Sequence, residues 1–142
     1  MIDPMKGYPG YLLRRVSAAS MAALGRRLDA LELRPSEATV LLVIESNPGA
    51  RSSDIGRLLD IASANMTPLI ARLVEQELLE RQAVDGRSRG LSLTARGRAL
   101  TARIHAIIDR HEEELLARIP ARQREAFIAA LRNLLEQDAP SI

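Results

Sequence analysis

The sequence predicts a mainly α-helical fold with one small β-hairpin, and three observations support this. Apolar residues recur every three or four positions over most of the 142-residue chain, which is the spacing of amphipathic helices. Between residues 80 and 94 the pattern becomes strand-like around a glycine-containing loop, as is typical of a hairpin. Apolar residues make up 46% of the chain, enough for the core of one ordinary domain.

The first helix is expected over residues 11–31, where apolar residues form one stripe. Residues 1–10 contain two prolines and two glycines, and we expect a loose lead-in to a single domain at residues 11–142. Pro35 opens a second helix because proline is tolerated at the first helical position. This helix is apolar on most sides, so we expect it to be buried, and a turn at residues 47–49 ends it.

A short third helix and a longer fourth helix follow. Ser52 or Ser53 can cap the third helix, and Asp54 lies in its first turn, where the helix dipole favours an acid. Residues 60–63 form a tight connection. The fourth helix then repeats apolar residues at spacings of three and four and ends near Leu78.

Two short strands at residues 80–84 and 91–94 come next, joined by a loop with an Asp-Gly pair and a second glycine. Thr94 can cap a long helix that we expect from Ala95 to Arg118. Pro120 marks a break, and a last helix runs over residues 122–136. The chain therefore closes with two helices that follow the hairpin.

The order of elements predicts a winged helix-turn-helix at about residues 35–98, because a short helix, a turn and a second helix precede the hairpin. Net charge is only +2, yet residues 81–98 hold five arginines against one acid. Arginine suits bidentate contacts with phosphates and bases. A helix of this kind fits the major groove, and an arginine-bearing loop can enter a narrow minor groove.

Four segments resemble the MarR family of bacterial transcription regulators: SDIGRLL (53–59), ANMTPLIARLVEQELLER (64–81), DGRSRG (85–90) and LSLTARG (91–97). The resemblance extends from about Tyr11 to Glu136. It implies that helices at about residues 11–31 and 99–136 interlock two chains into a homodimer. It also implies a transcriptional repressor that binds double-stranded DNA at a pseudo-palindromic operator. A small-molecule effector, aromatic or anionic, would release this repressor from the operator.

The resemblance places the DNA-binding residues on the fourth helix and in the hairpin. The front of the helix is expected to meet base edges and phosphates, and a later arginine to grip phosphate. In the hairpin, one arginine is expected in the minor groove, a second arginine is a further DNA candidate, and an aspartate stabilises the loop. The front of the helix consists of Ser63, Asn65, Met66, Thr67 and Pro68, and the later arginine is Arg72. In the hairpin, Arg87 is the arginine expected in the minor groove, Arg89 is the further candidate, and Asp85 is the stabilising aspartate.

Several of these assignments have a structural alternative. Met66 and Pro68 can be packing residues, and Asn65 and Thr67 can serve only as caps near the helix start. The charged hairpin tip can be a solvated loop without a partner.

Two residues depart from the family pattern. Glu77 stands where relatives usually have the glycine that ends the recognition helix, so either Glu77 adopts a strained left-handed conformation or the helix ends differently. Pro68 lies inside that helix if it begins near Ser63. We therefore expect a local bend or irregular turn at residues 64–67, with Thr67 as an alternative cap for a helix that begins at Pro68.

The resemblance also implies an effector pocket between the dimer helices and the winged unit. Arg14, Arg15 and His105 are polar residues on the elements expected to line it, and an arginine there could hold a carboxylate. The alternative is that they are exposed helix charges and a partly buried histidine.

Several other functions are excluded by composition. The absence of cysteine removes thiol catalysis, thiol redox sensing and cysteine-based zinc sites. His105 and His111 are six residues apart and do not share a helix face, so we expect no metal and no cofactor. No nucleophile–base pair is evident, so we expect no enzyme.

The chain also lacks a signal peptide and any apolar run near the roughly 20 residues that a membrane span needs, which predicts a cytoplasmic protein without membrane contact. Two further alternatives remain open. One is an architectural winged-helix protein without an effector. The other is a protein-interaction module, against which the arginine-rich hairpin argues.

Overall fold

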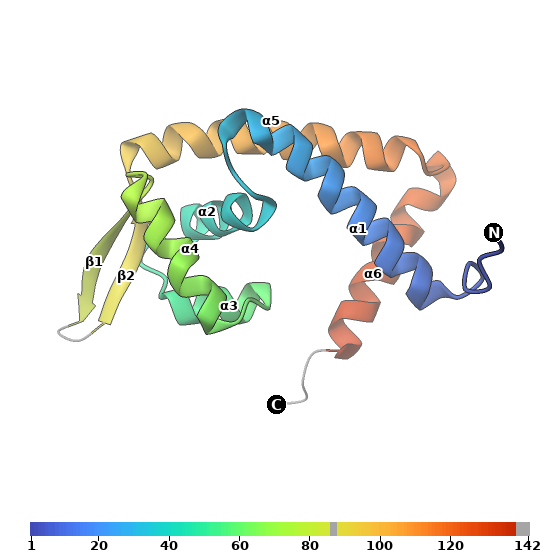
Figure 1. The fold of residues 1–142 in the computed structure, drawn as a ribbon, viewed down its shortest axis with the longest axis horizontal. Helices are drawn as coiled ribbons and strands as arrows, with labels where there is room; N and C mark the ends of the chain where they lie inside the picture. Colours follow the sequence, from blue (N-terminus) through green and yellow to red (C-terminus); the bar gives the residue numbers. More distant parts are fainter. Residues whose placement is uncertain (86–87, 139–142) are drawn as a thin grey trace. The chain divides into compact units, whose positions relative to one another are not determined.

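The computed structural model describes the backbone of residues 1–85 and 88–138, with the side chains of residues 84, 85, 88, 137 and 138 left aside. The chain divides into two compact units, Met1–Ile107 and Ile108–Ile142, which are described separately. Figure 1 shows mainly helical structure with one two-stranded hairpin, which confirms the predicted fold class. The elements are α1 (Pro9–Leu28), η1 (Asp29–Leu31), α2 (Pro35–Ser46), α3 (Ser52–Leu59), α4 (Ser63–Glu75), β1 (Leu79–Asp85), β2 (Ser88–Leu93), α5 (Ala95–Ala117), η2 (Ala121–Gln123) and α6 (Arg124–Asp138).

The core of the first unit is centred on α2. Pro35 occupies the first turn of this helix, as predicted, and Val40, Leu41 and Ile44 are fully buried. Further buried apolar residues of this unit come from α1, the rest of α2, α3, α4, α5, both strands and the connecting loops: Leu24, Leu28, Leu33, Ala38, Ile55, Met66, Ile70, Leu73, Leu78, Leu79, Leu91, Leu93 and Ile104. The expectation of a buried second helix is confirmed.

Helix α3 begins without a side-chain cap. Its N-cap is Arg51, and Ser52 is already the first helical residue, so the prediction that Ser52 or Ser53 caps this helix is wrong. Asp54 does lie in the first turn, and its carboxylate is 3.4 Å from the guanidinium of Arg57. The helix dipole favours the negative charge of Asp54, and the Asp54–Arg57 pair adds to this effect. Both stabilise the start of α3 without a capping hydroxyl.

The turns after η1, α3 and α4 share one unusual feature, a non-glycine residue with positive φ. These residues are Glu32 (56°), Asp60 (56°) and Glu77 (60°). After α4, the amide of Glu77 donates to the carbonyl of Val74 (3.0 Å) and the amide of Leu78 donates to that of Leu73 (3.0 Å). This is the Schellman arrangement. Glu77 therefore takes the left-handed conformation, the first of the two alternatives, and α4 ends at Glu75 rather than near Leu78.

Helix α4 is continuous across residues 64–67, so the predicted irregular turn is wrong. The helix begins at Ser63, and the hydroxyl of Thr67 donates to the carbonyl of Ser63 (3.2 Å), so Thr67 is not a cap. Pro68 lacks the amide that would bond to Ala64. Because Ala64 is exposed, water can take the place of that donor. Burial of the opposite face then decides the conformation of this stretch.

The hairpin is antiparallel, with Leu79 opposite Leu93 and Gln82 opposite Gly90, and its register shifts between Ala83 and Asp85. A third segment, which the sequence did not predict, pairs with it. The amide of Gly49 donates to the carbonyl of Leu91 (2.8 Å), and the amide of Leu91 donates to that of Ala50 (2.9 Å). The loop after α2 therefore anchors the base of the hairpin.

Thr94 joins the hairpin to α5 and confirms the predicted cap. Its hydroxyl accepts a hydrogen bond from the amide of Gly97 (3.0 Å) and donates one to the carbonyl of Glu77 (2.6 Å). A Cβ atom at Gly97 would overlap the carbonyl of Leu78. Only glycine allows the first turn of α5 to approach the end of α4 so closely.

The second unit begins with the last part of α5, which ends at Ala117. Pro120 follows and precedes η2, as the predicted break requires. The Nε atom of Arg124 donates to the carbonyl of Ile119 (2.9 Å) across this break. Within the described ranges, no helix combines the length and apolar character that crossing a membrane requires.

Candidate nucleic-acid interface

The front of α4 presents short polar side chains to solvent. Ser63, Asn65 and Thr67 are exposed, and so is Pro68. Asn65 can offer both a donor and an acceptor to an adenine edge, and the hydroxyls can bond to bases or phosphates. This face has the chemistry that reading a major groove requires.

Met66 does not belong to this face. It is 2% exposed and packs against Gly56 of α3, where a Cβ atom would lie 3.0 Å from the Met66 Cγ atom. The alternative role as a packing residue therefore holds for Met66, and Gly56 provides the space that brings α3 and α4 together.

A cleft of about 690 Å³ lies between α3 and the front of α4. Its polar lining comes from Ser52, Ser53, Arg57, Asp60, Ser63 and Thr67. The sequence analysis did not select Ser52, Ser53 or Arg57 as DNA-facing residues, although their position on the first helix of a helix-turn-helix was available as a signal. Hydroxyls, amides at a helix start and an exposed arginine are suitable partners for phosphate oxygens.

Arg72 lies on α4 but is engaged within the protein. Its Nε atom is 3.5 Å from a carboxylate oxygen of Glu37 on α2, and its Nη2 atom donates to the carbonyl of Glu32 (3.4 Å). The Glu37 side chain is 3% exposed. The guanidinium predicted to grip phosphate therefore already has two partners.

In the hairpin, Arg89 is exposed on β2 opposite Ala83. Arg87, predicted for the minor groove, lies outside the described residues, as does the side chain of Asp85. Arg81 on β1 and Arg96 at the start of α5 are also exposed. The described part of the hairpin thus carries two exposed arginines, Arg81 and Arg89.

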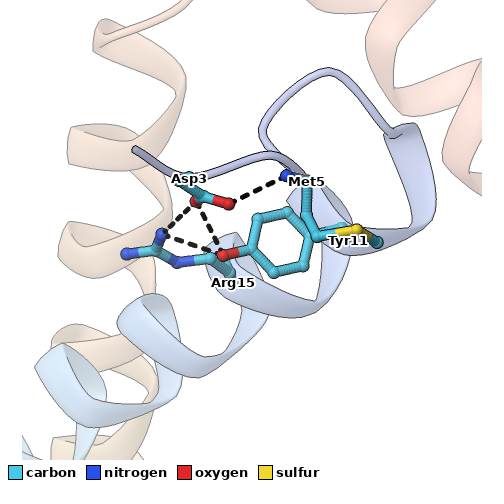
Figure 2. Close-up of polar contacts among 4 residues, drawn as sticks. All are labelled: Asp3, Met5, Tyr11 and Arg15. Atoms are coloured by element: carbon cyan, nitrogen blue, oxygen red, sulfur yellow. Dashed lines mark hydrogen bonds and ion pairs between the residues drawn. The ribbon is translucent and has the colours of Figure 1, made fainter. Parts of the chain in front are cut away.

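Both arginines proposed for an effector pocket lie near the ring of Tyr11 on α1, and Figure 2 shows one of them, Arg15. The Tyr11 hydroxyl donates to Asp3 (2.8 Å), and Arg15 is 3.3 Å from both the Tyr11 hydroxyl and the Asp3 carboxylate. Arg14 lies 5.4 Å from the centre of the Tyr11 ring. These hydrogen bonds lower the pKa of Asp3, that from Tyr11 most strongly, and raise the pKa of Arg15. Residues near the start of the chain are thus attached to α1, which the sequence did not predict.

His105 has a separate environment. Its Nε2 atom lies 2.7 Å from one carboxylate oxygen of Glu45 on α2, and the hydroxyl of the fully buried Thr101 donates to the other oxygen (2.7 Å). The Thr101 bond, followed by the His105 bond, lowers the pKa of Glu45. No described contact joins His105 to Arg14 or Arg15. Among the described residues, no group of three acidic or histidine side chains could hold a metal ion.

The helix-turn-helix, the exposed polar front of α4 and the arginine-bearing hairpin together define a class of protein: a winged helix-turn-helix that binds double-stranded DNA. A sequence model described as the MarR family matches residues 31–90. The HTH-type transcriptional repressor Rv2887 of Mycobacterium tuberculosis is 32% identical over 127 residues, which cover 88% of this chain and 91% of that protein. The chain therefore belongs to the MarR family, and it is a transcriptional regulator rather than an enzyme.

Solved structures agree with this assignment. A Mycobacterium tuberculosis Rv2887 complex with DNA has a TM-score of 0.75 and 29% identity, and covers 89% of this chain and 96% of that one. Rv2887 in complex with salicylic acid has a TM-score of 0.74 and 32% identity, covering 89% and 95% of the two chains. The transcriptional repressor CouR bound to p-coumaroyl-CoA has a TM-score of 0.85 and 26% identity, covering 95% and 96%.

Proposed function

We propose that this protein is a homodimeric repressor that binds a pseudo-palindromic operator and is released from it by an aromatic or anionic small molecule. The observation that carries the proposal is the exposed polar front of α4, beside the cleft between α3 and α4. Two similar proteins add support, since Rv2887 occurs in complex with DNA and with salicylic acid, and CouR with p-coumaroyl-CoA. Its place of action would be the cytoplasm, where operator DNA is found.

The proposed DNA contacts divide into two groups. Ser63, Asn65, Thr67 and Pro68 of α4 face the major groove, with Asn65 bonded to an adenine. Arg89 enters or borders the minor groove, together with Arg87 from the loop that Asp85 stabilises.

The proposed dimer uses apolar side chains that the single chain leaves exposed. On α1 these are Leu12, Leu13, Val16 and Met21, and on α6 they are Leu134 and Leu135. Exposed apolar residues in such number are typical of surfaces that a partner covers. Two copies would present their recognition helices to half-sites about one DNA turn apart, roughly 34–36 Å.

The proposed effector site includes an arginine without a carboxylate partner. Arg15 is paired with Asp3 and His105 with Glu45, so an anion at either residue has to compete with a carboxylate. Arg14 has no acidic partner among the described residues and stacks on Tyr11. It is the residue we favour for an effector carboxylate.

Selection of duplex DNA from a random pool at about 150 mM salt tests the proposal. A palindrome with half-sites one turn apart is the expected result. Asn65→Ala should then weaken binding to that site by about 1–3 kcal/mol and relax the preference at one base position. Arg122→Gln in the second unit removes an exposed positive charge that is not among the proposed contacts, and it serves as the control. Tight binding only at low salt, without a motif, would support an architectural protein instead.

A further inference from the structure

A buried carboxylate lies behind the recognition helix α4. The Glu37 side chain is 3% exposed and faces two arginines, Arg72 of α4 at 3.5 Å and Arg34 at 3.8 Å. Its Oε2 atom, the one nearer Arg72, makes no hydrogen bond to the residues described. A buried charge needs an opposite charge close by. Arg72 is therefore the closer of the two groups that balance Glu37.

The two arginines are not equivalent. Arg34 is 76% exposed, whereas the Arg72 side chain is 41% exposed and makes a second bond. That bond, to the carbonyl of Glu32, reaches the left-handed residue where the chain turns from η1 toward α2. Arg72 thus connects the recognition helix to the turn before α2 and to the first turn of α2 at once.

The front of α4 and Arg72 lie about two turns apart along the helix. Ser63, Asn65 and Thr67 are exposed, while Arg72 faces α2 and the preceding junction. To turn its Nε and Nη2 atoms toward a phosphate, Arg72 would have to leave Glu37 buried without its closer ion partner. Breaking a buried pair in this way is strongly unfavourable.

We propose that Arg72 is a positioning residue for DNA binding: through Glu37 and the Glu32 carbonyl it sets the orientation of α4 against α2, and it contacts no phosphate. The inference rests on the proposed operator binding, and it replaces the phosphate contact predicted for Arg72 from the sequence. It also gives the α1–α2 junction a direct connection to the recognition helix. A ligand that moves the junction would act on α4 through this arginine.

Operator binding across a salt series separates positioning from phosphate contact. The variants are Glu37→Gln, Arg72→Gln and the double variant, with Arg122→Gln as the control for loss of one positive charge. A positioning role predicts that each single variant weakens operator binding by about tenfold and that the double variant is no weaker than either. The slope of log K against log salt should equal that of the wild type. The effect of Glu37→Gln is diagnostic, because this residue is buried and cannot touch DNA.

A phosphate contact predicts other results and would overturn the proposal. Arg72→Gln would then reduce the salt slope by about 0.9 for each protomer, and Glu37→Gln would leave binding unchanged or strengthen it. If Arg72→Gln fails to fold, the double variant is compared with Glu37→Gln instead. These two proteins differ only at Arg72, so the difference between their salt slopes shows whether Arg72 contacts phosphate.

A measurement without DNA distinguishes failure of this inference from failure of the proposed function. Urea unfolding of the wild type and the variants gives the coupling between Arg72 and Glu37. An absence of coupling between Arg72 and Glu37 overturns the positioning role of Arg72, whatever the protein binds. If the variants show clear coupling but the wild-type protein selects no DNA sequence, the proposed function is refuted. The role of Arg72 in positioning α4 for DNA is then refuted with it.

Discussion

Replacing Glu77 by glycine should stabilise the protein, although the substitution removes a charged side chain in the helix-turn-helix unit. Glu77 has a φ of 60° directly after α4. For an L-residue this left-handed conformation costs roughly 1–2 kcal/mol, because Cβ approaches the following carbonyl. Glycine adopts it without that cost.

The expected gain is smaller than the strain, because glycine loses more backbone entropy on folding, about 0.5–1 kcal/mol. The Glu77 side chain is exposed, and the contacts that close the turn come from its backbone, including the carbonyl that accepts from Thr94. These contacts persist in Glu77→Gly. The net effect is a gain of about 0.5–1 kcal/mol, or roughly 2–3 °C in Tm for a chain of this length.

Urea unfolding at one fixed protein concentration measures this gain, because the stability of a dimer depends on concentration. The slope m should stay constant while the midpoint rises. Glu75→Gly is the matched control: Glu75 is also an exposed glutamate but has helical conformation as the last residue of α4. It should lose about 1 kcal/mol. If Glu77→Gly is destabilised as much as Glu75→Gly, the strain argument is refuted.

Three further changes test the packing and electrostatics of the first unit. Gly97→Ala should cost about 1–3 kcal/mol or more by urea unfolding, because the new Cβ overlaps the Leu78 carbonyl; a neutral effect would contradict the close approach of α5 to the end of α4. Thr94→Ala should cost about 0.5–2 kcal/mol in the same assay through loss of the cap on Gly97, whereas an unchanged midpoint would show that the cap contributes nothing. Glu45 has a lowered pKa in the folded state, so it contributes stability above its unfolded pKa of about 4.3, and this contribution is lost as the pH falls through the folded pKa. Thr101→Val removes the largest cause of that lowering and should flatten the acid limb of the stability curve; an identical limb in both proteins would exclude Glu45 as its source.

Most of the fold follows from local patterns. The apolar spacing located all the main helices, Pro35 and Pro120 marked two boundaries correctly, and the Asp-Gly loop located the hairpin. The errors lie at helix ends and within α4. Pro68 suggested an irregular turn, but burial of Met66, Ile70 and Leu73 keeps the helix continuous. The local preference was real, and packing of the opposite face was stronger.

The candidate site was only partly predictable, because a sequence shows which residues share a helix but not which face is covered. Met66 and Asn65 are neighbours on the recognition helix, yet one packs on Gly56 and the other is exposed. Ser52, Ser53 and Arg57 line the same cleft from α3 without carrying a motif that marks them.

The sequence by itself determined the order of helices and strands, the family and the concentration of arginine at the hairpin, because these depend on residues close together in the chain. Tertiary structure decided the partners of charged groups. Arg72 and Glu37 are 35 positions apart, and Ala50 pairs with Leu91 across a similar gap. Such contacts arise only when the core brings α2 against α4 and the hairpin. No periodicity or local preference encodes them, since their energy depends on a burial that the folded chain alone creates.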